Sequence, residues 1–569
     1  MPATMNDSRS ERRLLAKPSK PSKPKVIRTL GYLERYEAAL ISLDLYRNSI
    51  LTCRYTVPPA LLMVDGSHDK IMHRIEAAMA RVILDHPMLR VGMRGANSRK
   101  PAFVELQSID FSQLVEWRTF SPEAEDYESD LWAFIQARVD EKPTQLVTLP
   151  GWRAVVLRVE GTRFVDIMIE FGHAHLDGMS IKLFHEEMRR YLSSYHDNDD
   201  NLQITPEGFQ DRVLTIPVEK RRDLPPPMHE LYKFSFTTRY TLSTLWQELK
   251  PAALHEKTGM EADWAPIRAQ PFVTLSRVFR LHDSLLQNIL TKCRAHNTTL
   301  TGLLDTLLAV ILALRLPPEN SRGFIGNTIV DLRPLIRKTS KYLQRTNIDP
   351  RHIMENILTT VDHEFSPELV ALIRAKAEEA TKEMEGEGHE QVEENTRGAG
   401  DWEQGYKMLA LEEFVWLAAA RVRAEIQARL DDGTNDKTGL LKYISDCRTL
   451  HKDTMKKPRA LTYSVSNLGV IDGAPPVVAK GKEKEGSVKQ EGNVERKEDD
   501  EDRWTIERAT FSLSAELPQS AFLLCPVSVK GKELSMYLSW QDCTIDAELG
   551  DAVTADLETW LRFFGREED

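Results

Sequence analysis

The chain alternates between stretches with apolar residues at every second position and stretches with apolar residues three or four positions apart. The clearest pair of such stretches flanks residues 172–178. Before them, the apolar residues alternate, which predicts a strand with one buried face: Val165, Ile167, Ile169 and Phe171. After them, the steps of three and four predict an amphipathic helix: Ile181, Phe184, Met188, Tyr191 and Tyr195.

The same two periodicities recur along most of the chain and predict a mixed α/β fold. Helices are expected over residues 30–46, 71–84, 131–139, 299–316, 367–429 and 551–564. Strands are expected over residues 50–57, 102–106, 152–159, 273–281, 323–330, 461–469, 509–513, 521–529 and 533–540. The last helix carries an apolar stripe that either packs on the second half of the chain or lies on a bilayer.

The length of 569 residues favours at least two lobes. Residues 1–27 are basic and rich in Ser and Pro, which indicates a disordered arm. We assign residues 28–215 to an N-terminal lobe and residues 216–569 to a C-terminal lobe. Charged low-complexity sequence near residues 383–401 and 479–503 predicts two solvated insertions in the second lobe.

Composition narrows the class of partner. The net charge of -11 argues against nucleic acid as a main partner, because such a binder needs a concentrated basic face. Five scattered cysteines lack the spacing of a disulfide framework or zinc site, which is typical of reduced intracellular thiols. No run approaches 18 apolar residues, so we expect no membrane-spanning helix. We therefore expect a cytoplasmic monomer, and leave open a peripheral contact with endoplasmic reticulum or lipid-droplet membrane.

Residues 172–178, between the predicted strand and helix described above, carry the candidate catalytic or binding side chains. Three interpretations apply to His173, His175 and Asp177. His173 is a structural histidine with Asp177 as the N-cap of the next helix, or the three residues bind a metal, or His173 is a general base without a metal. The metal interpretation lacks a fourth ligand and a second cluster, so we predict no metal site.

Arg90 is the one charged residue in the short apolar stretch 88–93. It either extends to the surface or pairs with a buried carboxylate.

The motif His173-Ala174-His175-Leu176-Asp177-Gly178 resembles the His-x-x-x-Asp-Gly signature of the CoA-dependent acyltransferase superfamily, which includes chloramphenicol acetyltransferase and condensation domains. Other segments resemble family segments in the same order: residues 85–90, 331–334 and 464–469. The opening residues 28–36 are similar to the start of the fungal alcohol O-acetyltransferase branch. The Asp-Phe-Gly-Trp-Gly element of the plant branch is absent, which leaves the residues that contact CoA unassigned.

The resemblance implies two chloramphenicol-acetyltransferase-like lobes, each a mixed sheet covered by helices, with an active-site tunnel between them. Carried over by position, His173 is the catalytic base, and Asp177 is a structural residue that pairs with an arginine, for which Arg90 occupies the matching place. Gly178 lets the chain turn tightly beside it. His175 has no assigned role. Ser464, Ser466 and Asn467 are candidates to stabilise the oxyanion, although they equally suit a turn before Gly469.

The implied activity is transfer of an acetyl group from acetyl-CoA to the hydroxyl of a hydrophobic alcohol or secondary metabolite. Acyl-CoA is a co-substrate, and no permanently bound cofactor is expected. The alternative is a condensation-like or non-catalytic member that binds a carrier protein or another partner in place of CoA.

Overall fold

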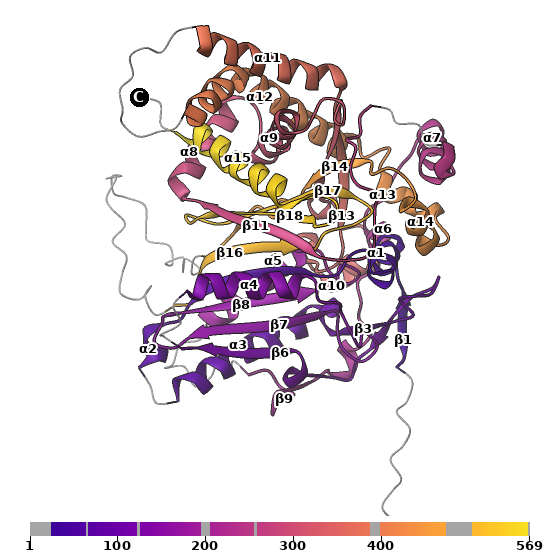
Figure 1. The fold of residues 1–569 in the computed structure, drawn as a ribbon. Helices are drawn as coiled ribbons and strands as arrows, with labels where there is room; N and C mark the ends of the chain where they lie inside the picture. The colour runs from indigo at the N-terminus through magenta and orange to yellow at the C-terminus, as the bar shows by residue number, and fades with distance from the viewer. Residues whose placement is uncertain are drawn as a thin grey trace, which may run out of the picture.

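The computed structural model describes residues 24–63, 66–121, 126–194, 205–254, 259–386, 399–473 and 503–566. Two β-sheets lie one above the other, and helices cover their outer faces (Figure 1). The N-terminal elements, indigo to magenta in Figure 1, form the lower half, and most C-terminal elements form the upper half. The predicted mixed α/β architecture with two lobes is confirmed.

The lower sheet has five strands in the order β16-β2-β8-β7-β6. Its members are β2 (Ser49–Thr56), β6 (Val115–Phe120), β7 (Trp152–Val159), β8 (Phe164–Phe171) and β16 (Thr505–Leu513). The neighbours are antiparallel except for β6 and β7. The prediction that β8 has one buried face is wrong, because both faces are covered. Ile167 and Ile169 pack in the core that contains α3 and α5, whereas Met168 packs with α4.

Helices cover both faces of this sheet. The helices α3 (Ser67–Asp85) and α5 (Gly178–Ser193) pack against each other on one face, and α4 (Tyr127–Val139) lies on the other. All three were predicted with boundaries within about five residues, because their apolar stripes are regular.

The upper sheet has the order β11-β18-β17-β14-β12-β13, and β15 pairs with β17. Its strands are β11 (Thr274–Leu281), β12 (Phe324–Asp331), β13 (Leu358–Phe365), β14 (Leu461–Val465), β15 (Val470–Ile471), β17 (Ser520–Val529) and β18 (Leu534–Gln541). The helices over it are α8 (Asp283–Ala295), α9 (Leu300–Arg315), α11 (Pro367–Gly386), α12 (Ala399–Asp432) and α15 (Ala547–Gly565). The apolar stripe of α15 is buried in this core, so it is not a bilayer-facing surface.

Strand β16 belongs structurally to the lower sheet, although it lies in the sequence assigned to the C-terminal lobe. It pairs along its length with β2, and the same strand contacts β17 and β18 of the upper sheet. Strand β16 therefore joins the two halves, because it pairs in the lower sheet and packs against the upper one. Local hydrophobic periodicity carries no information on strand partners, so a division at residue 215 missed it.

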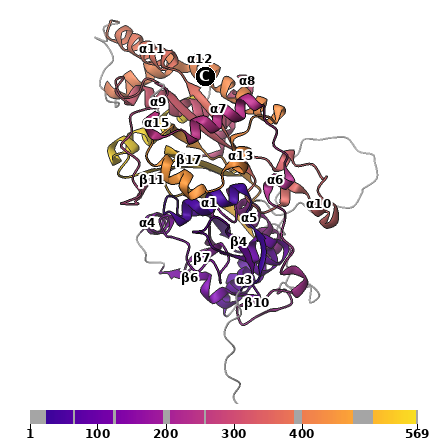
Figure 2. The ribbon, with the colours of Figure 1, turned by 90° about the vertical axis from the view of Figure 1, so that its right-hand side faces the viewer.

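The remaining elements fill the seam and the edges. Helix α1 (Tyr32–Ser42) lies at the level where the two halves meet in both Figure 1 and Figure 2, and it contacts α14. Two small sheets have the orders β1-β4-β3 and β5-β10-β9. The other bounds are β1 (Val26–Thr29), β3 (Val91–Arg94), β4 (Ala102–Glu105), β5 (Ser108–Asp110), β9 (Phe209–Gln210), β10 (Val213–Thr215), α2 (Pro59–Leu62), α6 (Met228–Leu231), α7 (Thr238–Leu249), α10 (Lys341–Thr346), α13 (Lys437–Leu440) and α14 (Cys447–Thr454).

The predicted arm and insertions fall mainly outside the described residues. Two residues assigned to the arm, Val26 and Ile27, belong instead to β1, which pairs with β4. The backbones of α11 and α12 extend a few residues into the first predicted insertion. Among the described residues, no single helix has the length and composition of a membrane span, and α8 with α9 meets the criteria only as a pair bent by 92°.

Candidate active site

The His-x-x-x-Asp-Gly motif occupies the turn between β8 and α5, as predicted. The turn begins where the Gly172 amide donates to the carbonyl of Gly151, 2.8 Å away, which ties it to β7 at its start. The His175 amide donates back to the Gly172 carbonyl at 2.9 Å. A strand and a helix packed in one core thus hold both ends of the motif.

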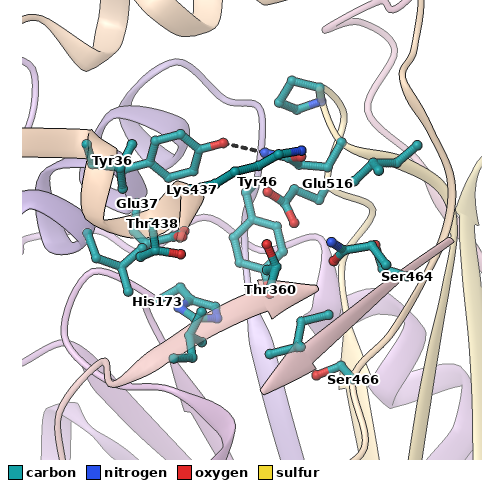
Figure 3. A pocket seen from close by; sticks show the side chains of 18 of the residues that line it. Tyr36, Glu37, Tyr46, His173, Thr360, Lys437, Thr438, Ser464, Ser466 and Glu516 are labelled. Atoms are coloured by element: carbon teal, nitrogen blue, oxygen red, sulfur yellow. Dashed lines mark hydrogen bonds between the residues drawn. The ribbon is translucent and has the colours of Figure 1, made fainter. Parts of the chain in front are cut away.

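His173 is half-buried and lines a cavity of about 350 Å³ between the two halves (Figure 3). The Asn356 side-chain amide donates to the His173 carbonyl at 2.7 Å and lies 3.2 Å from Nδ1. The Tyr46 ring lies edge-on to the imidazole at 6.0 Å between centroids. Burial lowers the pKa of His173, and the opposing effects of Asp177 and its own backbone carbonyl are smaller. The imidazole is therefore neutral near pH 7.

The Asp177 carboxylate accepts hydrogen bonds from several donors. Its Oδ1 accepts from the Ser180 amide at 2.8 Å, which makes Asp177 the N-cap of α5. Arg333 donates to both carboxylate oxygens, at 2.8 and 2.9 Å, and the Ile357 amide donates to Oδ2 at 2.9 Å. Burial alone would raise the pKa of Asp177, but Arg333 and these hydrogen bonds hold it below its ordinary value.

The predicted pairing of Asp177 with Arg90 is wrong, and Arg333 is the partner. The Arg90 guanidinium donates instead to three backbone carbonyls, those of Lys220, Ile83 and Leu84. It therefore fixes the end of α3 against a later loop. Arg90 lies in a short apolar stretch of the sequence. Its buried guanidinium is satisfied by hydrogen bonds to carbonyl oxygens and needs no carboxylate partner.

The absence of a predicted role for His175 agrees with its packing. Its ring lies 5.1 Å from that of Phe103, and neither ring nitrogen has a hydrogen-bond partner among the described residues. Burial lowers its pKa to about 4, so the ring is neutral. A Cβ atom at Gly151 would come within 2.3 Å of the same ring. His175 thus serves as core packing beneath the motif.

Gly178 is required for a different reason from the predicted tight turn. It is the first residue of α5 and is not among the described glycines with positive φ. A Cβ atom at this position would lie 2.6 Å from Leu468 and 2.9 Å from Phe511. The absence of a side chain lets the start of α5 approach the β14–β15 turn and β16.

The three oxyanion candidates separate into two groups. Ser464, Ser466 and Asn467 all line the cavity. The Asn467 side chain donates to Thr301 at 3.0 Å and accepts from the Gly469 amide at 2.8 Å, so it stabilises the turn. The hydroxyls of Ser464 and Ser466 remain available to a bound molecule.

The motif side chains do not converge as metal ligands. His173 faces the cavity, His175 packs in the core, and both oxygens of Asp177 accept from Arg333. Within the described residues, no group of three His, Cys, Asp or Glu side chains is placed to hold a metal ion.

The profile of the alcohol acetyltransferase family matches residues 29–324. The chain belongs to this family. Similar curated proteins are the probable alcohol acetyltransferase FCK4 of Fusarium pseudograminearum, 27% identical over 96% of both chains, and the probable alcohol acetyltransferase crmB of Aspergillus fumigatus. The second is 21% identical over 91% of this chain and 95% of the relative. The predicted resemblance to the fungal alcohol acetyltransferases is thereby confirmed.

Solved structures agree on the fold of this acetyltransferase. TRI3 trichothecene 15-O-acetyltransferase from Fusarium sporotrichioides is 14% identical, covers 94% of both chains and gives a TM-score of 0.62. The starter condensation domain of rhizomide synthetase RzmA, solved in complex with C8-CoA, gives a TM-score of 0.51 at 11% identity, over 94% of both chains. The predicted chloramphenicol-acetyltransferase-like architecture is confirmed at this level.

Sequence reasoning missed two residues that shape the environment of His173 in this acetyltransferase, Asn356 and Tyr46. Asn356 precedes β13, and the only signal was a polar pair, Glu355 and Asn356, between apolar neighbours. Tyr46 was counted as part of a helix, but it follows α1 and lines the cavity. Neither residue belongs to a motif with a fixed spacing, so the fold alone brings them to His173.

Proposed function

We propose that this acetyltransferase transfers an acetyl group from acetyl-CoA to the hydroxyl of a largely apolar alcohol, with His173 as general base. The observation that carries the proposal is a neutral, half-buried imidazole on the wall of a cavity between the lobes. Most of the cavity wall is apolar, which suits an apolar acceptor. The apolar wall includes Leu33, Met179, Leu245, Ile329, Leu358, Leu440, Leu441, Ile444, Leu468 and Leu513.

In this mechanism the Nδ1–H tautomer of His173 donates to the residue's own carbonyl and leaves the lone pair of Nε2 free. Nε2 takes the proton of the acceptor hydroxyl as its oxygen attacks the thioester carbonyl. The tetrahedral intermediate then expels CoA thiolate, which receives the proton from the imidazolium. The products are the acetyl ester and CoA thiol. Ser464 or Ser466 donates to the oxyanion while it exists.

CoA as co-substrate is supported by the family and by the C8-CoA complex of the rhizomide synthetase domain. Asp177 takes no part in proton transfer, since Arg333 and the backbone already hold it as a carboxylate. Its contribution is the orientation of the turn that carries His173. Asn356 is a positioning residue, because its amide fixes the His173 carbonyl.

The test is release of CoA thiol from acetyl-CoA with a panel of apolar alcohols. Replacement of His173 by Gln keeps the side-chain volume and is expected to lower kcat by about 10² to 10⁴-fold. His282→Gln is the matched control, because this histidine is 84% exposed and lies outside the cavity. Thiol release by His173→Gln at the wild-type rate would exclude His173 as the base.

A further inference from the structure

Two carboxyl groups on the cavity wall have no cationic partner within the part of the chain that the structure describes. Glu37 projects from α1 and is only 8% exposed, and Glu516 lies in the loop between β16 and β17. Both line the cavity, and Figure 3 shows them with Tyr36 and Tyr46. Among the described residues, neither carboxyl group forms a hydrogen bond or an ion pair.

Three other carboxylates that border the cavity and are buried or partly buried have a cationic partner. Asp177 and Asp331 both pair with Arg333, and Asp362 pairs with Lys437. Glu248, at the edge of the cavity, is exposed, so water screens it. Among the described residues of the cavity wall, Glu37 and Glu516 are therefore exceptional in being wholly or partly buried without a countercharge.

The two carboxyl groups and His173 line the same cavity. The charge of Glu516 raises the pKa of Glu37, and both carboxyl groups contribute to a raised pKa of Tyr46, after burial and despite a hydrogen bond to Ser49. The ring of Tyr46 in turn lies 6.0 Å from that of His173. Tyr46 is thus next to the base and within the electrostatic influence of both carboxyl groups, and all four side chains line the cavity that would hold the acceptor.

A sheltered pair of carboxyl groups requires a proton or a cation, because ionising both without one places two like charges in a poorly solvated site. Burial raises the pKa of Glu516 to about 7 and that of Glu37 in the same direction. A bound cation would supply the missing countercharge and draw out the retained proton. The phosphates of CoA would be repelled here, which assigns this part of the cavity to the acceptor.

We propose that Glu37 and Glu516 form a binding site for a positively charged nitrogen of the acceptor, which makes the substrate class an amino alcohol with a largely apolar frame. The hydroxyl reaches His173, and the protonated or quaternary nitrogen lies between the two carboxylates. This inference rests on the proposed function and narrows its substrate. Charge-assisted contacts of this kind discriminate by about tenfold to a hundredfold.

The experiment compares choline with its uncharged isostere 3,3-dimethylbutan-1-ol, because the two alcohols differ only in nitrogen against carbon. Binding is measured by thermal shift, and turnover by release of CoA thiol from acetyl-CoA. We expect the wild type to bind choline more tightly and to use it with a kcat/KM about tenfold or more above that of the isostere. A thermal shift with choline no larger than that with the isostere, including no shift with either, overturns the inference.

The variants Glu37→Gln and Glu516→Gln keep the shape of the site and remove its charge. Each is expected to lower kcat/KM for choline about tenfold or more relative to that for the isostere, which abolishes the preference for choline. Glu548→Gln, an exposed glutamate at the start of α15, is the control for net charge. Retained choline preference in both site variants also contradicts the inference.

Failure of the proposed function gives a different result from failure of this inference. If the inference alone is wrong, the enzyme acetylates neutral alcohols without a preference for the cation. If the proposed function is wrong, neither choline nor a neutral alcohol supports release of CoA thiol. The thermal shift with choline then still tests whether the carboxyl pair binds the cation. Circular dichroism melting of each variant confirms that it is folded.

Discussion

Arg333 holds the motif in place because its guanidinium is almost fully buried and bonds to the motif and to several acceptors in the second half of the chain. It bonds to Asp177 and Asp331 and to the carbonyls of Ile353 and Glu355. Asp177 belongs to the lower half of the molecule. Asp331 is the last residue of β12 in the upper half. A single side chain thus fixes the motif turn relative to the second lobe.

Removal of this guanidinium in Arg333→Met leaves the Asp177 carboxylate buried without a countercharge. We expect a loss of about 3–5 kcal/mol in the free energy of unfolding, measured by urea denaturation. Adding Asp177→Asn should cost far less than the sum of the single changes, because the coupling is then already lost. Arg90→Ala combined with Asp177→Asn is the control, and these two changes should add. Additivity in the Arg333 pair would contradict the assigned partner.

The pKa of His173, the proposed proton acceptor, also depends on its immediate surroundings. Burial lowers the pKa of His173 below the ordinary value of 6.5, so the active neutral form persists to lower pH than for an exposed histidine. With a neutral alcohol as acceptor, which avoids the Glu37 and Glu516 site, kcat/KM should be flat at pH 7 and fall only below about pH 6.5. A pH–rate profile gives the midpoint. A midpoint above 7 would show that burial does not control this imidazole.

At the scale of elements, the start of α5 is wedged against the second lobe. Gly178→Ala is expected to destabilise the protein by about 1–3 kcal/mol, because the new methyl group meets Leu468 and the stiff ring of Phe511. Activity should fall together with stability, since the same turn carries His173. Gly405→Ala in α12 is the matched control, because its Cβ meets no atom within 4 Å and alanine favours a helix. Thermal melting and thiol release measure both effects.

Elements with regular apolar periodicity could be predicted from the sequence, and irregular ones could not. The segments around the motif, β8 and α5, were predicted because their apolar residues alternate or recur at helical steps. Helix α7 was missed, since none of its residues is fully buried and its pattern is weak. Strand β13 was missed because polar residues alternate with buried ones of mixed type, among them His363 and Thr359.

The same limit applies to the site. His173 and Asp177 could be found because a fixed spacing joins them, and their roles came from a resemblance and not from composition. Arg333 was quoted as part of a similar segment, but its contact with Asp177 spans 156 residues and depends on how the lobes dock. The assignment of Arg90 failed for this reason. Glu37 and Glu516 lie far apart in sequence, and only the fold makes them neighbours.

At the scale of the whole molecule, the cavity draws its wall from both halves of the chain. The first half contributes residues of α1 and the motif turn, and the second contributes β12, β13, β14 and the loop after β16. Strand β16 also ties the two sheets together through β2 and β17. A ligand that occupies this cavity therefore contacts both lobes and can bind only when they are docked.

Binding of CoA should consequently raise the unfolding temperature of the whole chain, because a ligand that prefers the native state stabilises it. At a hundred times its dissociation constant the stabilisation is about 2.7 kcal/mol. His173→Gln should retain the shift while losing turnover, since Nε2 acts on the hydroxyl proton and holds no part of CoA. A shift produced by an acyl carrier protein and absent with CoA would instead support a condensation-like donor.

Because the docked lobes form the cavity, Arg333→Met should weaken the CoA shift even at temperatures where the variant remains folded. This result would link the ion pair to function independently of its cost in stability.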